Sequence, residues 1–219
     1  MQNVDWSLCL VTDRTLSLGH PLEYVIEQAI KGGVTMVQLR EKTCSSKDFY
    51  ELAMAIKQLL QHYHIPLIIN DRLDIAMAVN ADGIHIGQSD IPWQVVRRLW
   101  GKEKIIGLSV ENVQQVIDSN SMNIDYIGLS PVFATPTKTD TAMPLGLEKV
   151  KEMASLSKHP TMAIGGINMH NVSQVISCDV SGIAVVSAIS SAENPMFAAK
   201  QLKNEIDNYK KLKTLNKKI

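Results

Sequence analysis

The sequence predicts an α/β fold, a single-domain (βα)8 barrel of the TIM type, from three observations. Eight short apolar runs alternate with eight longer amphipathic segments from one end of the chain to the other. The 219 residues divide into roughly 27 per strand–helix unit, near the compact limit for a closed eightfold barrel. Neither a linker rich in Pro, Gly and Ser nor a change of composition marks a second domain, so we expect one domain over residues 1–219.

The apolar runs predict strands that are buried on both faces. Each is short, rich in Ile, Val and Leu, and bounded by Gly, Pro, Asn or Asp. In chain order they are SLCLVTD (7–13), TMVQLRE (35–41), PLIIND (66–71), GIHIGQ (83–88), IIGLSV (105–110), YIGLSPVF (126–133), TMAIGGI (161–167) and GIAVVSAI (182–189). His85 alternates with Ile84 and Ile86 in the fourth run, so we expect a hydrogen-bonded core histidine that points into the barrel.

The segments between these runs predict helices with one buried stripe, because their apolar positions recur at three and four residues. Several begin with Ser, Asp, Asn or Pro, which are signals of a helix N-terminus. The segments cover residues 21–33, 46–63, 72–80, 91–101, 111–120, 145–157, 171–179 and 194–210. The basic end of the chain, KKLKTLNKKI (210–219), is expected to be a frayed, solvated helix end.

A doubly wound open sheet would also alternate strands and helices. Such a sheet usually has five or six strands, and its dinucleotide-binding version carries GxGxxG after the first strand. Here the first strand ends in VTDR, with no glycine cluster. The closed barrel is therefore favoured.

Composition and charge exclude several classes of function. The 22 Lys and Arg balance the 22 Asp and Glu, so we expect no general electrostatic binding of nucleic acid or of an anionic membrane. The N-terminus lacks the regions of a signal peptide, and no segment approaches a membrane-spanning length. Cys9, Cys44 and Cys178 are scattered and lack metal-ligand spacing. We therefore expect a cytoplasmic protein with reduced cysteines.

Polar residues collect where the predicted strands end, which is where barrel enzymes carry their working residues. Asp71 and Asp90 end two neighbouring strands, and hard oxygen ligands of this kind are what Mg²⁺ prefers. Each could instead cap the helix that follows it. Because both lie on one rim beside basic residues, the sequence favours a magnesium site.

Two kinds of anion site are predicted on the same rim. Arg40, Lys42 and Lys138 could neutralise a diphosphate and stabilise it as it leaves, although each could instead form a salt bridge, with Glu41 as the obvious partner for one of them. Gly165 and Gly166 after the seventh strand, with Val186 and Ser187 at the end of the eighth, could bind phosphate through backbone N–H groups. The paired glycines could also mark only a tight turn.

The stretch ATPTK (134–138) lies between these two anion sites. Thr135 and Thr137 could donate to one anion while Lys138 reaches the other, and the polar TDTAMP (139–144) suits a mobile cover. Two anions, one of them with a metal, indicate a transferase that joins a diphosphate donor to a phosphorylated acceptor.

Taken together, QLREK, IINDR, ADGIHIGQSD, GLS, PVFATPTK, AIGGI and VVSAI resemble, in this order and spacing, the thiamine-phosphate synthase family. The resemblance extends from LVTDR to the last helix. It implies a (βα)8 barrel that couples 4-amino-2-methyl-5-(diphosphooxymethyl)pyrimidine to 4-methyl-5-(2-phosphooxyethyl)thiazole, giving thiamine phosphate and pyrophosphate. In that family the pyrophosphate is thought to leave first, and the thiazole nitrogen then captures the pyrimidine carbocation.

The resemblance also implies roles for individual residues, with two small phosphorylated molecules as the partners. The pyrimidine diphosphate would be bound by Gln38, Leu39, Arg40, Glu41, Lys42, Asn70, Ser109 and Lys138, of which Arg40, Lys42, Ser109 and Lys138 would be catalytic. Mg²⁺ would be bound by Asp71 and Asp90. The thiazole phosphate would be bound by Thr135, Pro136, Thr137, Gly166, Val186 and Ser187. A homo-oligomer is compatible with this picture.

The chain departs from the family pattern at three places. Ser130 precedes Pro131 where the family commonly has Gly, Cys9 replaces a frequent tyrosine, and Ser89 stands where an acidic residue is frequent.

Two other functions are alternatives to the synthase. A thiazole tautomerase of the same barrel family tends to carry a histidine just before the VF pair, where this chain has Pro131. A non-catalytic barrel that binds thiamine phosphates would not need Lys138 and two carboxylates to stabilise a leaving group.

Overall fold

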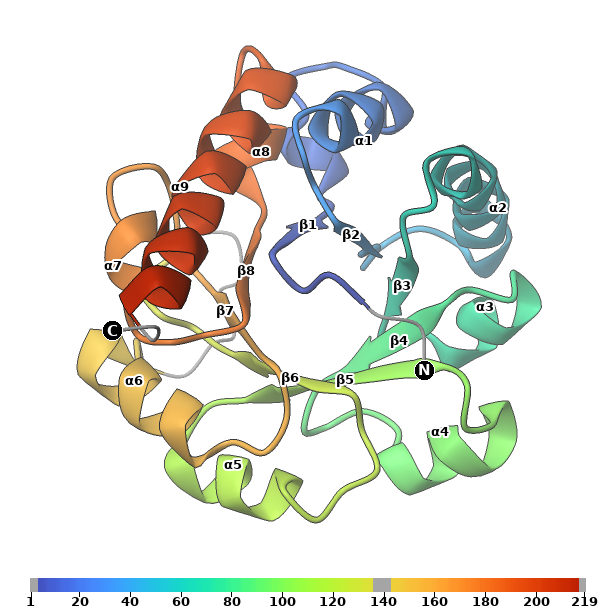
Figure 1. Ribbon diagram of the computed structural model, residues 1–219. Helices are drawn as coiled ribbons and strands as arrows, with labels where there is room; N and C mark the ends of the chain where they lie inside the picture. The colour runs from blue at the N-terminus through green and yellow to red at the C-terminus, as the bar shows by residue number, and fades with distance from the viewer. Residues whose placement is uncertain (1–3, 136–142, 217–219) are drawn as a thin grey trace.

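The computed structural model describes residues 4–135 and 143–216, which form a closed barrel of eight parallel strands surrounded by helices (Figure 1). Each strand pairs with the next along the chain, and β8 pairs with β1 to close the barrel. The predicted fold class is confirmed. The strands are β1 (Leu8–Val11), β2 (Met36–Leu39), β3 (Leu67–Asn70), β4 (Gly83–Ile86), β5 (Ile105–Val110), β6 (Tyr126–Leu129), β7 (Thr161–Ile164) and β8 (Gly182–Val185).

A helix lies in each of the eight segments that the sequence predicts to be helical. These helices are α1 (Leu22–Lys31), α2 (Ser46–Tyr63), α3 (Leu73–Ala78), α4 (Trp93–Trp100), α5 (Val113–Ser119), α6 (Gly146–Leu156), α7 (Val172–Ile176) and α9 (Pro195–Asn216). Two short elements were not predicted, the 3-10 turn η1 (Arg14–Leu16) and the helix α8 (Ser187–Ser190). Both follow a strand directly, on the side of the barrel where the polar strand ends gather.

Every strand except β5 is shorter than its predicted run. In β6, β7 and β8 the reason is that the loop residues that follow are as apolar as strand residues. β6 ends at Leu129, yet Val132 beyond it is fully buried. β7 ends at Ile164, and Ile167 beyond it is 5% exposed. After β8 the chain turns directly into α8. These loops fold back onto the core, so their composition reflects burial and not strand pairing.

Apolar side chains fill two separate regions. The larger lies between the strands and the surrounding helices, and the smaller fills the inside of the barrel. Within the barrel, Trp6 packs against Tyr126 with ring centroids 5.0 Å apart. Trp6 precedes β1, so it fills the end of the barrel at which the strands begin. The opposite end, where the strands finish, is left for a cavity.

A glycine makes room for two rings inside the barrel. The strand register pairs His85 with Gly107 and Gly107 with Tyr126, which places the three residues in one row across β4, β5 and β6. A Cβ atom at Gly107 would lie 2.2 Å from Cζ of Tyr126 and 2.5 Å from Nδ1 of His85. Because the side chain is missing there, the rings of His85 and Tyr126 approach to 5.4 Å between centroids.

The last helix holds the end of the chain against the barrel. α9 continues to Asn216, Lys210 Nζ donates to Ser7 Oγ at 2.7 Å, and Lys213 Nζ donates to Asp179 Oδ1 at 2.6 Å. Residues 210–216 thus continue the helix, and most of them are exposed, as a solvated helix end is expected to be. Residues 217–219 lie outside the described residues.

The cysteines are all free, as expected from their spacing. Cys9 is fully buried inside the barrel, and burial raises the pKa of its thiol to about 12, so the thiol stays protonated at neutral pH. Over residues 4–135 and 143–216, no helix is long and apolar enough to cross a membrane.

Candidate active site

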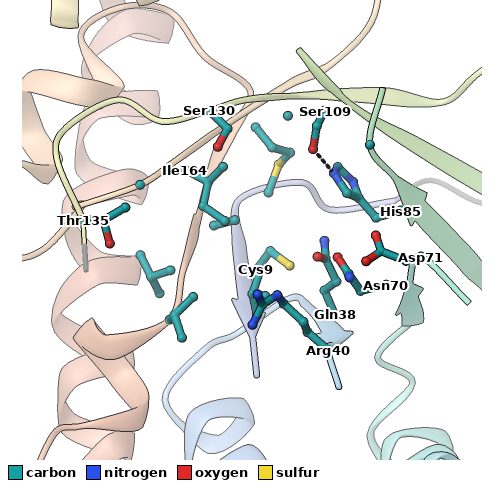
Figure 2. A pocket seen from close by; sticks show the side chains of 18 of the residues that line it. Cys9, Gln38, Arg40, Asn70, Asp71, His85, Ser109, Ser130, Thr135 and Ile164 are labelled. Atoms are coloured by element: carbon teal, nitrogen blue, oxygen red, sulfur yellow. Dashed lines mark hydrogen bonds between the residues drawn. The ribbon is translucent and has the colours of Figure 1, made fainter. Parts of the chain in front are cut away.

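The ends of the strands surround a cavity of about 330 Å³ (Figure 2). Its walls come from β1 to β8 and from the loops that follow them. Sequence-predicted residues that line it are Gln38, Arg40, Lys42, Asn70, Asp71, Asp90, Ser109, Thr135, Gly165, Gly166, Val186 and Ser187. Pro136, Thr137, Lys138 and most of the expected cover (139–144) fall within residues 136–142, outside the described part of the chain.

The carboxylates of Asp71 and Asp90 and the ammonium of Lys42 form the charged side of the cavity. Lys42 Nζ lies 2.6 Å from Asp71 Oδ2, and Asp90 Oδ2 accepts a hydrogen bond from the N–H of Gly87 at 2.7 Å. Burial raises the pKa of Asp90, and the nearby Asp71 carboxylate raises it further, against the opposing effects of Gly87 and Lys42. The two carboxylates are therefore close enough to repel each other, as a shared cation site requires.

The backbone geometry at Asp71 turns its side chain toward this side. Asp71 has φ of +62°, in the left-handed region that Asp and Asn adopt more readily than most residues. Its N–H donates to the carbonyl oxygen of His85 at 2.8 Å. The end of β3 is thereby tied to β4 at the point where the chain leaves the sheet.

The predicted ligand residues 38–42, at the end of β2 and just beyond it, point alternately toward the cavity and away from it. Gln38, Arg40 and Lys42 line the cavity, and Arg40 lies 4.0 Å from Asp13 Oδ2. Leu39 is fully buried in the outer core, and Glu41 also lies outside the cavity lining. Side chains at 39 and 41 therefore do not face the cavity, because successive residues of an extended chain point to opposite sides.

Glu41 pairs with Arg14 of the turn η1, and not with Arg40 or Lys42, which pair with Asp13 and Asp71. Arg14 Nη2 donates to Oε2 at 2.8 Å. Arg14 Nε lies 2.8 Å from Oε1 without an aligned hydrogen bond. The Glu41 side chain is only 7% exposed, so this ion pair anchors the segment that carries Arg40 and Lys42.

Glycines form the opposite side of the cavity. Gly165 and Gly166 have φ of +107° and +66°. A Cβ atom at Gly166 would lie 2.8 Å from Cβ of Phe133 and 2.9 Å from the carbonyl oxygen of Ala134. The pair therefore allows the β7 loop to pack against the chain leading to Thr135, and α8 begins nearby at Ser187.

The floor of the cavity contains two polar side chains that were not predicted to bind a ligand, His85 and Tyr126. His85 Nδ1 lies 2.8 Å from the hydroxyl of Tyr126, and His85 Nε2 lies 2.9 Å from Ser109 Oγ (Figure 2). The expectation of a hydrogen-bonded core histidine is confirmed. Tyr126 was missed because it opens a strand, away from the strand ends where the sequence places the site. A Ser–His pair is present here, but its third member is a phenol instead of the carboxylate of a catalytic triad.

These features define a protein of the (βα)8-barrel class whose cavity, at the ends of the strands, combines cations, two carboxylates and glycine backbone. The family model described as thiamine monophosphate synthase matches residues 8–189. The chain belongs to this thiamine-phosphate synthase family and is a transferase of thiamine biosynthesis.

Similar proteins support this assignment over nearly the whole chain. The thiamine-phosphate synthase of Syntrophomonas wolfei is 48% identical over 203 residues, covering 93% of this chain and 97% of the relative. That of Clostridium novyi is 44% identical over 202 residues, covering 92% and 99%. A solved thiamine phosphate pyrophosphorylase from Pyrococcus furiosus has a TM-score of 0.86 at 33% identity, covering 94% and 97%.

The family assignment does not favour the two rival functions, the tautomerase and the non-catalytic barrel. Enzymes of this family act on small phosphorylated substrates and use a metal in catalysis.

Proposed function

We propose that the cavity binds 4-amino-2-methyl-5-(diphosphooxymethyl)pyrimidine beside 4-methyl-5-(2-phosphooxyethyl)thiazole and joins them, with loss of pyrophosphate. One observation carries the proposal: a charged side of Lys42, Asp71 and Asp90 and a glycine side of Gly165 and Gly166 share one cavity. Such a cavity suits two different anions held side by side.

The pyrimidine diphosphate is assigned to the charged side. Arg40 and Lys42 provide cations from one strand end, and Asn70 and Gln38 are buried amides that suit the polar edge of a pyrimidine. Lys138 would add a further cation to the diphosphate. Leu39 and Glu41 would contribute through their backbone, since their side chains point away from the cavity.

The residues on this side fit Mg²⁺. Asp71 and Asp90 offer hard oxygen ligands. Burial and the nearby Asp71 carboxylate raise the pKa of Asp90, and a bound cation would relieve the repulsion between the two groups. When bound, Mg²⁺ would neutralise charge on the departing pyrophosphate. Arg40, Lys42 and Ser109 would hold the diphosphate oxygens and stabilise the same charge from the protein side.

The thiazole phosphate is assigned to the glycine side, where Thr135, Gly166, Val186 and Ser187 line the cavity. Pro136 and Thr137, which lie outside the described residues, are assigned to the same ligand. The thiazole nitrogen is neutral and carries no proton, so its attack on the pyrimidine carbocation needs no general base.

Turnover with both precursors tests the proposal. Purified protein, the two phosphorylated precursors and Mg²⁺ should give thiamine phosphate, measured by fluorescence after oxidation to the thiochrome. EDTA should abolish product formation, and excess Mg²⁺ should restore it. No product from the complete mixture would contradict the assigned reaction, and undiminished product in EDTA would remove the role of the two aspartates.

We also propose that the protein acts in the cytoplasm as a single-domain enzyme, without a nucleic-acid or membrane partner. A net charge of zero supports this setting, because it provides no general attraction to a polyanion.

A further inference from the structure

The cations Arg40 and Lys42 lie on a segment that has left the sheet, between the end of β2 at Leu39 and the start of α2 at Ser46. The backbone N–H of Arg40 donates to Thr12 Oγ1 at 3.0 Å. Beyond it, within residues 4–135 and 143–216, no hydrogen bond joins the backbone of residues 41–44 to another backbone group. Side chains must therefore hold this segment in place.

Glu41 is the side chain best placed to hold it. Its carboxylate is 7% exposed, and both of its oxygens face Arg14, at 2.8 Å from Nη2 and 2.8 Å from Nε. Glu41 stands between Arg40 and Lys42 in the chain and points away from the cavity that they line. Fixing the middle side chain therefore fixes the direction of its two neighbours, because successive side chains of an extended chain point to opposite sides.

Arg14 is itself held by the turn η1. Ser17 Oγ donates to the carbonyl oxygen of Arg14 at 2.9 Å, and Ser191 Oγ, from the loop after α8, donates to that of Leu16 at 3.1 Å. The turn is thus fixed both from within and from a neighbouring element, as the support of a functional group requires. Arg14 is not among the described residues that line the cavity, so it can act there only through Glu41.

Loss of Arg14 would change the charges around the diphosphate subsite. The Glu41 carboxylate would be left buried without a cation, which is a costly state. Its neighbours in the chain are Arg40 and Lys42, and a pair with either of them would take that cation away from a bound phosphate group. Arg14 thus keeps a negative charge turned away from the cations that a diphosphate needs.

We propose that Arg14 is a positioning residue for the diphosphate, which holds Glu41 so that Arg40 and Lys42 both point at the leaving pyrophosphate. Its guanidinium binds the two carboxylate oxygens from one side, a geometry that fixes direction as well as distance. This inference rests on the proposed function, because it takes the charged side of the cavity as the diphosphate subsite.

The test compares Arg14→Met with the unchanged protein. Binding of inorganic pyrophosphate in excess Mg²⁺ is measured by calorimetry, so that no turnover is needed. The dissociation constant should rise at least about tenfold, because a charge-assisted hydrogen bond to the ligand is no longer well placed. The KM for the thiazole phosphate should stay within about twofold, since that ligand is assigned to the opposite side. Arg14→Lys keeps the charge and should recover part of the affinity.

A second comparison shows whether Arg14 acts through Glu41. Glu41→Gln and the double variant Arg14→Met/Glu41→Gln complete a double-mutant cycle. The double variant should bind pyrophosphate no more weakly than Arg14→Met, because both substitutions break the same link. It also carries no unpaired carboxylate at position 41. Should Arg14→Met fail to fold by circular dichroism, the double variant should still show a loss of pyrophosphate affinity of about tenfold.

Arg97→Lys controls for a general loss of stability. Arg97 on α4 also pairs with a carboxylate, that of Asp125, which precedes β6 at the end of the barrel where the strands begin. The variant should lower the urea midpoint of unfolding, because the guanidinium also bonds the carbonyl oxygen of Asn123 at 2.9 Å. Its dissociation constant for pyrophosphate should stay within about twofold of the unchanged protein.

The inference is overturned if folded Arg14→Met binds pyrophosphate as tightly as the unchanged protein, or if the two single effects multiply in the double variant. Equal weakening by Arg97→Lys would overturn it as well, and so would a protein that forms thiamine phosphate yet binds no pyrophosphate. The proposed function fails separately, when the unchanged protein binds pyrophosphate but forms no thiamine phosphate from the two precursors.

Discussion

Asp71 and Asp90 are the two carboxylates for which we propose a cation site. Each carboxylate has a protein partner, the Lys42 ammonium for Asp71 and the Gly87 N–H for Asp90. The pair still repels, and together with burial this raises the pKa of Asp90. In the folded protein a proton or a metal cation near these groups is therefore favoured, and at neutral pH a divalent ion is the better match for two carboxylates.

Replacing Asp71 by Asn should lower kcat by roughly 10²- to 10³-fold, the range found when one electrostatic stabiliser of a transition state is removed. Asn tolerates the left-handed backbone at this position, so the fold should be kept, with an unchanged circular dichroism spectrum. Asp74→Asn is the control, because Asp74 lies outside the cavity and pairs with Arg72. A kcat within threefold of the unchanged protein in Asp71→Asn would remove Asp71 from the metal site.

For single residues, the sequence predicts well which side chains lie at the rim of the barrel, but it predicts poorly which side chains form ion pairs with one another. Asp71, Asp90, Arg40 and Lys42 were placed at the rim because strand ends in a barrel share one face. The partner of Glu41 was not foreseen, because Arg14 lies 27 residues away in a turn that no periodic pattern marks. A contact of this kind depends on strand register, which the sequence of one strand does not contain.

Among the elements, β4, β5 and β6 form the unit that supports the cavity floor. Their register places His85, Gly107 and Tyr126 in one row. The barrel interior is therefore filled there by the rings from β4 and β6, on either side of the glycine of β5. The hydrophobic pattern predicted all eight strands, since buried parallel strands are short apolar runs. It could not predict where β6, β7 and β8 end, because buried loop residues such as Val132 continue the same pattern.

Gly107→Ala should lower the free energy of unfolding by about 1–3 kcal/mol, as overpacking of a filled core does. The added Cβ would lie 2.2 Å from the Tyr126 ring, which has no room to move because Trp6 packs on it. Gly128→Ala is the graded control, since its Cβ would meet His85 at 3.2 Å, and its loss should be below about 1 kcal/mol. Urea unfolding midpoints compare the two, and equal stability of both variants with the unchanged protein would contradict the packing described for this row.

At the scale of the whole molecule, the closed barrel converts sequence separation into proximity. Gln38 and Ser187 are 149 positions apart in numbering, yet both line one cavity, because every strand delivers its end to the same face. The sequence was sufficient to predict this convergence and the family. It could not predict which side chains meet at the floor of the cavity, because Gln38, His85, Ser109 and Tyr126 come together there from four different strands.

The most direct measurement is a crystal structure of the protein with Mg²⁺, pyrophosphate and thiamine phosphate. We predict pyrophosphate and the metal beside Arg40, Lys42, Asp71 and Asp90, with the phosphate of thiamine phosphate at Gly166 and Ser187 on the opposite side of the cavity. Density for both phosphorylated groups on the same side, or for the metal away from both aspartates, would contradict the account.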